Sequence, residues 1–240
     1  MSFYFPNYSC QIPNLAEIYE KVFGQICDGT FVEVGAFDGE TFSNTNFLAD
    51  LGWRGVYIEP YHKSFEYCLN RHRLNTNTDV ICCAIGTEIG EVDLYQSFSY
   101  TVCQDSPVEV AYLSTTNLEQ TKIVPQIEWS NHFGFNKHKV FQNTLENVLI
   151  ENNIPKNFDI LIVDVEGNEK SVLNSFSIEE WKPKMMIIEL QDENENFKSF
   201  TDFIEECKDL RKKIIDYGYI ELYKDVVNTI FVDNNVIENI

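Results

Sequence analysis

The stretch FVEVGAFDGETFSNT, residues 31–45, indicates the fold class most clearly. An apolar run ends at Gly35, a second glycine follows at Gly39, and Ser43 and Asn44 stand where a helix is expected to begin. Glycine at a turn from strand to helix lets the backbone adopt positive φ and approach a ligand closely. Free amides at the start of the helix suit a carboxylate group on such a ligand. The stretch therefore predicts a ligand-binding turn at the end of a buried strand.

Apolar runs of the same kind recur along the chain and predict strands. They cover residues 31–35, 55–60, 79–86, 158–165 and 184–190. Several are apolar at consecutive positions, which is typical of parallel strands that are buried on both faces. Helical patterns alternate with them, at residues 13–27, 43–51, 62–74, 145–153, 168–175 and 197–217.

The end of the chain departs from this alternation. Runs at 219–223 and 229–233 are separated by too few residues for a parallel crossover, so we expect an antiparallel hairpin on the edge of the sheet. The predicted fold is α/β: a doubly wound, mostly parallel, seven-stranded sheet with a C-terminal antiparallel hairpin. Residues 1–240 are expected to form a single domain. Within it, residues 97–143 do not fit the alternation and are interpreted as a functional insertion.

Composition narrows the class of partner. The 240 residues are 44% hydrophobic, which suits one globular domain. With 18 Lys and Arg against 38 Asp and Glu, the formal net charge is -20, which disfavours nucleic acid and anionic membranes as partners. The seven cysteines show no C-x-x-C and no zinc spacing. We interpret them as reduced thiols and expect a cytoplasmic protein, with neither a secretory signal nor a membrane-spanning run.

The glycine loop distinguishes two classes of nucleotide ligand. Sites for NAD require G-x-G-x-x-G, and Phe37 stands at the position of the second glycine, so the pyrophosphate cradle is incomplete. S-adenosylmethionine has no phosphate, and its ammonium group can pair with an acid, for which Glu33 and Asp38 are the local candidates. A simple tight turn remains the alternative interpretation.

Two further strand ends fit a nucleoside. Glu59 ends the second expected strand, at the place where an acid can accept hydrogen bonds from both ribose hydroxyls. Cys83 and Ala84 lie near the end of the third, where small residues could hold the adenine. An ordinary strand-end turn and a plain core strand are the respective alternatives.

Acids follow the fourth and fifth expected strands. Asp164 and Glu166 follow the fourth and Glu189 ends the fifth, at the carboxyl edge where ligands bind in open α/β sheets. A buried carboxylate there needs a partner, a metal or a raised pKa, although Asp164 and Glu166 could also cap the next helix. The candidate substrate contacts are Glu189, His132 and His138. Both histidines also fit an ordinary surface role.

These motifs together resemble a known family. GAFDGETFSNT, GWRGVYIEP, TLENVL and FDILIVDVEGNEKSVL, within about residues 30–190, are similar to the FkbM family of methyltransferases. The resemblance implies a class I, Rossmann-like methyltransferase sheet, S-adenosylmethionine as cofactor, and often O-methylation of sugars or natural products. By position it implies that Glu33, Gly35, Asp38 and Glu59 contact the cofactor and that Asp164 and Glu166 lie at the reaction centre. The family often has a lysine two residues before this Asp, where the present chain has Ile162.

We therefore hypothesise an S-adenosylmethionine-dependent O-methyltransferase that acts on a hydroxyl of a sugar or glycan. Asp164 is the first candidate for the general base and Glu166 the second. Cofactor contacts are predicted at Glu33, Gly35, Ala36, Asp38, Gly39, Ser43, Asn44, Glu59, Cys83 and Ala84. The alternatives are a non-catalytic cofactor- or glycan-binding module on the same fold and a dinucleotide-dependent oxidoreductase. No metal ligand is assigned, although Mg²⁺ held by Asp164, Glu166 or Glu189 is a third alternative.

Overall fold

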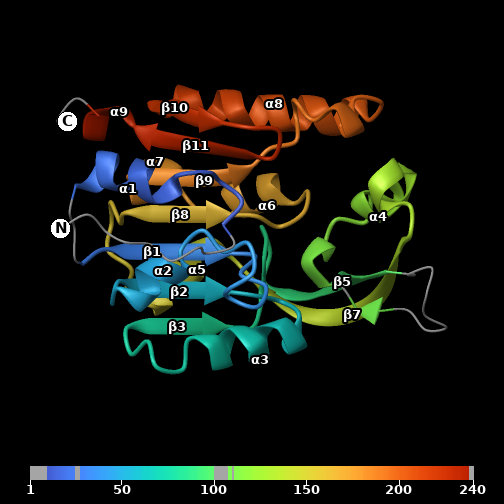
Figure 1. Ribbon diagram of the computed structural model, residues 1–240, viewed down its shortest axis with the longest axis horizontal. Coiled ribbons are helices and arrows are strands. Elements are labelled where there is room, and N and C mark those ends of the chain that lie inside the picture. The colour runs from blue at the N-terminus through green and yellow to red at the C-terminus, as the bar shows by residue number, and fades with distance from the viewer. Residues whose placement is uncertain (1–9, 25–27, 100–107, 110, 238–240) are drawn as a thin grey trace.

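The computed structural model describes residues 10–24, 28–99, 108–109 and 111–237. Seven strands form the main sheet in the order β10-β11-β9-β8-β1-β2-β3 (Figure 1). Their bounds are β1 (Thr30–Val34), β2 (Arg54–Ile58), β3 (Thr78–Ile81), β8 (Ile160–Val163), β9 (Met185–Glu189), β10 (Tyr219–Lys224) and β11 (Asn228–Asp233). The five strands from β9 to β3 pair in parallel, whereas β11 is antiparallel to both β9 and β10. The predicted α/β fold and its edge hairpin are confirmed.

Both faces of this sheet are buried, as the consecutive apolar runs predict. In β8, Leu161 and Val163 belong to one hydrophobic cluster, whereas Ile160 and Ile162 belong to another. The first cluster includes residues of α5 (Leu145–Glu151), α6 (Glu169–Leu173), α7 (Ile178–Trp181) and α8 (Thr201–Asp216). The second includes residues of α1 (Leu15–Phe23), α2 (Asn46–Asp50) and α3 (His62–Arg71). Helices on both faces make the sheet doubly wound.

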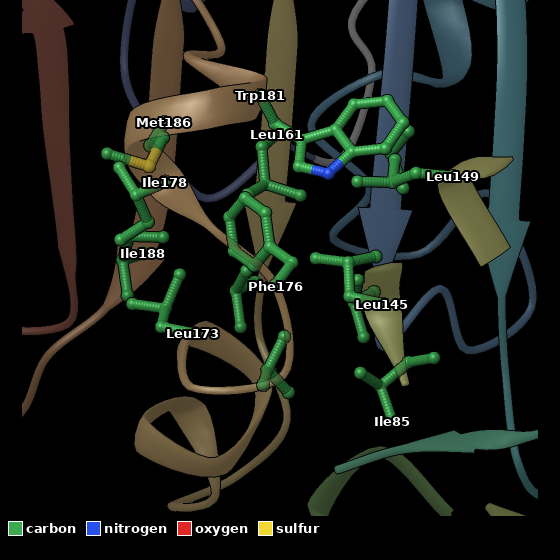
Figure 2. Close-up of a cluster of buried hydrophobic side chains, with 14 of the residues drawn as sticks. Ile85, Leu145, Leu149, Leu161, Leu173, Phe176, Ile178, Trp181, Met186 and Ile188 are labelled. Carbon is green, nitrogen blue, oxygen red and sulfur yellow. The ribbon is translucent and has the colours of Figure 1, made fainter. Parts of the chain in front are cut away.

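The first cluster holds the helices onto the sheet by close packing of large side chains. Figure 2 shows Leu145 and Leu149 of α5 and Trp181 of α7 gathered on the same side as Leu161. Leu145, Leu149 and Leu161 are fully buried. Each such side chain contributes about 1.5–3 kcal/mol by leaving water, so this cluster fixes the strand ends that carry the site.

A second, four-stranded sheet stands beside the main one, in the order β4-β7-β5-β6. Its long strands β5 (Gly90–Ser99) and β7 (Phe133–Asn143) pair antiparallel, and β4 (Ala84–Ile85) and β6 (Val108–Glu109) flank them. Short helices connect β6 to β7: η1 (Ala111–Leu113), α4 (Gln120–Ile123), η2 (Val124–Gln126) and η3 (Glu128–Ser130). Figure 1 shows β5 and β7 beyond the carboxyl ends of β1 and β2.

Three sequence-based bounds need correction. The expected strand 79–86 is two strands, β3 in the main sheet and β4 in the second, with Cys82 and Cys83 between them. The chain leaves the main sheet there, and β3 is the edge strand of that sheet. The departure from the alternation therefore begins before residue 97, and residues 100–107 and 110 of the expected insertion lie outside the described residues. The end of the expected helix 13–27 lies outside them as well.

The helix expected at 43–51 begins at Asn46 instead. Ser43 Oγ accepts a hydrogen bond from the Asn46 N–H (3.1 Å) and donates one to Glu33 Oε2 (3.0 Å). Ser43 thus ties the start of α2 to β1 rather than standing in its first turn. The remaining helices are η4 (Glu195–Phe197) and α9 (Asn234–Ile237). Within the described ranges, no helix combines the length and apolar character needed to cross a membrane.

Candidate active site

The site is built where three neighbouring parallel strands end. Glu33 lies near the end of β1, Asp164 directly follows β8, and Glu189 ends β9. Because β9, β8 and β1 are adjacent and parallel, their carboxyl ends meet at one edge and bring these acids together. Gly35 permits this approach, since its φ is 90° and an added Cβ would lie 1.7 Å from the Asp164 carbonyl oxygen.

The larger of two neighbouring pockets, which we call the acidic pocket, has a volume of about 260 Å³. Its carboxylates are those of Glu33, Asp164, Glu166 and Glu189. The connection between β6 and β7 contributes to the opposite wall with Tyr112, Leu113, Gln120 and Val124. No lysine, arginine or histidine is found among the described residues that line it.

The smaller pocket, of about 50 Å³, lies on the β2 side. Its lining includes Glu59 and Pro60 after β2, Cys83 and Ala84, and the apolar side chain of Leu94. A shared wall joins it to the acidic pocket, because both are lined by Gly35, Phe37, Tyr112, Asp164 and Glu166. One elongated ligand could therefore contact both pockets.

Glu59 is buried and anchored from two sides. Its Oε2 accepts a hydrogen bond from the Phe37 N–H (2.9 Å) and its Oε1 accepts one from the Tyr61 N–H (2.8 Å). These bonds fix the carboxylate between the glycine loop and the end of β2, and each oxygen keeps a second lone pair for a ligand. Burial raises the pKa of Glu59 to about 8 despite both bonds. The side chain is thus positioned to accept a pair of hydroxyl groups.

Glu33 is buried and is surrounded by hydroxyl groups. Ser43 and Thr45 donate their hydroxyls to Glu33 Oε2, and the Asn44 backbone also bonds to the carboxylate. Burial nevertheless raises the pKa of Glu33 to about 7. Since Glu33 also lines the acidic pocket, a cationic ligand group there would favour its ionised form.

Asp164, Glu166 and Glu189 form a compact group of carboxyls. One oxygen from each lies within 4.8 Å of the others. Burial is the main cause that raises all three pKa values, and the negative charge of Asp164 adds to the rise at Glu166 and Glu189. Glu166 has φ 56°, in the left-handed region that a non-glycine residue rarely adopts, and Gly167 follows with φ 88°. This turn holds the Glu166 side chain in the pocket lining.

Glu169, at the start of α6, has a structural role. It is 5% exposed, and its Oε1 accepts the N–H groups of Val165 (3.2 Å) and Gly167 (3.1 Å). The turn that carries Glu166 is therefore fixed by this carboxylate. Burial raises the pKa of Glu169 to about 7.

The other predicted site residues are divided between the pockets and the surrounding fold. Ala36 and Ser43 line the acidic pocket, and Cys83 and Ala84 line the smaller one. Three predicted cofactor contacts line neither pocket: Asp38, Gly39 and Asn44. Asp38 accepts hydrogen bonds from within its own turn, at the Glu40 and Thr41 N–H groups, whereas Gly39 packs against Cys68 and His72 of the α3 region.

The two histidines of the second sheet line neither pocket. His132 is exposed and its ring lies 4.5 Å from that of Phe133. His138 is in the middle of β7, opposite Leu94, with its ring 5.4 Å from that of Tyr61. The structure therefore brings neither histidine to the acids.

Tyr112 and Gln120 are among the lining residues that the sequence reasoning missed. The Tyr112 ring lies in edge contact with Phe37 (6.5 Å between centroids) and with Phe42 (6.2 Å), so it closes the cleft over the glycine loop. Gln120 is 4% exposed, and its Nε2 has no hydrogen-bond partner among the described residues. The only signal for either residue was its place in the segment that breaks the strand–helix alternation.

Comparison with known proteins decides the family. The model of the methyltransferase FkbM domain matches residues 33–221, which includes both pockets' strand ends. The chain belongs to this family. It is an S-adenosylmethionine-dependent methyltransferase, as the resemblance of its motifs implied, and S-adenosylmethionine is its cofactor. A search of curated proteins found no significant match.

Solved structures with a similar chain path are distant in sequence. The Methanococcus jannaschii fibrillarin pre-rRNA processing protein is 14% identical, with 85% of this chain and 66% of that chain covered and a TM-score of 0.42. TrmK of M. capricolum with S-adenosylhomocysteine is 11% identical (90% and 68% covered, TM-score 0.43). An O-methyltransferase from Bacillus cereus with the same product is 13% identical (91% and 79% covered, TM-score 0.43).

The residues of the two pockets suit this cofactor. The smaller pocket offers Glu59 for a ribose diol and apolar side chains, Ile58, Ile85 and Leu94, for a base. Glu33 in the acidic pocket suits the ammonium group at the opposite end of the cofactor. Between them, the shared wall offers carboxylates to the positively charged sulfur region.

Proposed function

We propose that the chain methylates a hydroxyl group of a neutral polyol, sugar or glycan, at the acidic pocket. The composition of that pocket is the observation that supports this proposal. The pocket combines four carboxylates with the unpartnered amide of Gln120 and has no cationic side chain among its described lining residues. Such a lining repels phosphate or carboxylate groups and offers hydrogen-bond acceptors to hydroxyls. Nucleic acid fits poorly for the same reason, in keeping with the net charge of -20.

The division of the cleft supports an order of binding sites. The adenosine end is assigned to the smaller pocket and the amino-acid end to Glu33, so the shared wall is the proposed place of methyl transfer. The acceptor would then enter from the side formed by Tyr112, Gln120 and Val124, which belong to the second sheet and its connections. Gln120 Nε2 is a donor suited to an oxygen of the acceptor.

The chain's own residues orient the reactants and manage a proton. When bound, S-adenosylmethionine supplies a methyl carbon for attack; the new bond is from oxygen to carbon, and the carbon–sulfur bond breaks with its electrons left on sulfur. Tyr112 and the apolar lining exclude water from the shared wall. Asp164 is the first candidate to accept the hydroxyl proton during or after attack, and Glu166 is the second. Since burial raises both pKa values, each carboxylate is a stronger base than an exposed one.

A screen for methylated products tests this proposal. Purified protein is incubated with S-adenosylmethionine and each of a panel of neutral sugars, glycans and polyols, and products are identified by mass spectrometry. We expect added methyl groups on at least one neutral hydroxyl compound and none on phosphorylated analogues. Methylation restricted to amines or to phosphorylated compounds would contradict the proposal. Binding of S-adenosylhomocysteine with no product in any class would support the non-catalytic alternative.

Asp164→Asn provides the matched test of the base. The substitution keeps the shape of the side chain and removes its charge, so cofactor binding should persist. With an acceptor from the screen, turnover should fall by about 10²–10⁴-fold, the usual contribution of a general base. Turnover close to wild type in Asp164→Asn together with inactive Glu166→Gln would assign the base to Glu166. Near-normal turnover in both variants would contradict a carboxylate base.

A further inference from the structure

The contact between Asp164 and Glu189 poses a problem of charge. These side chains lie within hydrogen-bonding distance of each other, yet each ionised carboxylate is only an acceptor. Glu189 is 6% exposed, and its Oε2 receives no hydrogen bond from any donor in the described part of the chain. Two acceptors in contact need either a shared proton or a cation between them.

The geometry points to the cation: we infer that Asp164, Glu166 and Glu189 bind a divalent, oxygen-seeking metal ion. Two oxygens on one ion can be no farther apart than twice the metal–oxygen distance, about 4.6–5.2 Å for Ca²⁺ and about 4.0–4.2 Å for Mg²⁺. The three carboxyls already satisfy the larger limit, because one oxygen of each lies within 4.8 Å of the others. Closing the longest separation by at most about 0.6–0.8 Å would satisfy the smaller one.

The surroundings provide no competing cation. The described lining of the acidic pocket contains no lysine, arginine or histidine that could neutralise the group. The nearest bonded partner of Glu189 is Gln191, whose neutral amide donates to Oε1 and leaves Oε2 free for an ion. A divalent ion would compensate two of the three negative charges.

An observation outside the three acids also points to a ligand here. Gln120 lines the same pocket and is only 4% exposed, yet its amide nitrogen has no described acceptor. Hard cations such as Mg²⁺ keep several water molecules when protein side chains bind them. A metal-bound water, or a hydroxyl of the acceptor on the ion, would supply the missing acceptor for Gln120.

The ion would also explain how the pocket selects hydroxyl groups. Adjacent hydroxyls of a polyol could replace metal-bound waters, and the ion would lower the pKa of a bound hydroxyl. Each carboxylate has two oxygens, so one oxygen can bind the ion while the other receives a proton. This statement about the acceptor rests on the proposed function, whereas metal binding itself does not.

The test measures binding of Mn²⁺ alone to the full chain after exhaustive dialysis against a chelator. Electron paramagnetic resonance reports free Mn²⁺, and Mg²⁺ and Ca²⁺ are added as competitors. We expect one site per chain, competed by either ion. In Glu189→Gln the affinity should fall at least tenfold, whereas Glu151→Gln, which makes the same charge change at an exposed residue of α5, should bind as wild type does.

Two controls keep the result interpretable. Circular dichroism and thermal unfolding of metal-free Glu189→Gln should match or exceed wild type, because the substitution removes a repelled carboxylate and leaves an amide that can donate to Asp164. If it does not fold, Glu166→Gln takes its place. Binding of S-adenosylhomocysteine is measured in the same samples. Normal binding of that product with no saturable Mn²⁺ site would overturn the metal inference and leave the proposed function standing. A saturable Mn²⁺ site without binding of the product would support the metal inference and contradict the proposed function.

Discussion

Glu59 combines a structural role with a proposed ligand-binding role. Its two oxygens hold the N–H groups of Phe37 and Tyr61, so it connects the glycine loop to the end of β2. Glu59 also lines the smaller pocket, where a ribose is expected. A substitution at Glu59 should therefore affect both the loop and the ligand.

Glu59→Gln should separate these effects by size. The amide keeps one acceptor oxygen and turns a donor toward one of the two N–H groups. We expect binding of S-adenosylhomocysteine to weaken by about 1.5–3 kcal/mol and the free energy of unfolding to fall by about 1–3 kcal/mol. Calorimetry and denaturant unfolding measure the two quantities, with Glu66→Gln on the exposed side of α3 as control. Wild-type affinity in Glu59→Gln would exclude it as the ribose acid.

The raised pKa of Glu59 predicts how binding depends on pH. Burial raises this pKa to about 8, so the carboxyl is protonated in the free protein at neutral pH. Ribose hydroxyls donate to the ionised form, so ligand binding favours loss of that proton. Affinity should therefore rise with pH between about pH 6 and 8. The probe is 5′-methylthioadenosine, which lacks the amino-acid end and so does not report on Glu33; in Glu59→Gln the rise should disappear.

Gly35 tests the close approach of strands at the site. Gly35→Ala places a methyl group against the Asp164 carbonyl, whereas Gly52→Ala has the same kind of backbone, with φ 92°, and open space around it. We expect Gly52→Ala to lower the free energy of unfolding by about 1–2 kcal/mol from backbone strain alone. Gly35→Ala should lower it by more and should also impair S-adenosylhomocysteine binding. Equal losses in denaturant unfolding would mean that the approach to Asp164 is not tight.

Among residues, the strand-end acids could be predicted from the sequence because parallel strands place their carboxyl ends together. Asp164 and Glu189 were found in this way, whereas Glu33 was found as an acid beside the glycine loop. The structural effect of having Ile162 where the family often has a lysine could not be predicted. In the structure Ile162 lies beside Glu33 across the β1–β8 pair, buried in the apolar cluster, and hydroxyl groups rather than a lysine hold Glu33. These hydroxyls belong to Ser43 and Thr45 in the loop before α2, which sequence spacing does not place near β8.

At the scale of elements, the second sheet brings its connecting segments to the cofactor edge of the main sheet. Its alternating polar and apolar strands, β5 and β7, are joined by 33 intervening residues, Tyr100–His132. Such distant pairing leaves only a weak local signal, which explains why no second sheet was predicted. The parallel strands were easier to predict, because each is apolar at consecutive positions and each is followed by a helix.

Tyr112 shows what this second sheet adds to the site. Its ring contacts Phe37 and Phe42 from the glycine loop and lines both pockets. Tyr112→Ala should weaken S-adenosylhomocysteine binding by about tenfold, because a buried aromatic wall is replaced by water. Tyr112→Phe keeps the ring and should bind as wild type does. Equal affinities of the two variants in calorimetry would show that the ring does not contribute to binding.

At the scale of the whole molecule, charge is the dominant surface property. The formal net charge of -20 should destabilise the compact state by self-repulsion, which salt screens. The melting temperature should therefore rise by about 2–4 °C between low salt and 0.15 M NaCl, the shift that about 1 kcal/mol produces in a chain of this size. Scanning calorimetry in NaCl measures it. A fall in melting temperature would mean that the surface ion pairs outweigh the repulsion.

The arrangement of one ligand across two pockets is the central claim, and a crystal structure of the complex with S-adenosylhomocysteine tests it most directly. We expect the ribose hydroxyls to contact Glu59 and the amino-acid end to lie near Glu33. The sulfur should face the shared wall, which is formed by Gly35, Phe37, Tyr112, Asp164 and Glu166. A nucleoside bound in the acidic pocket, or a ribose without contact to Glu59, would contradict it.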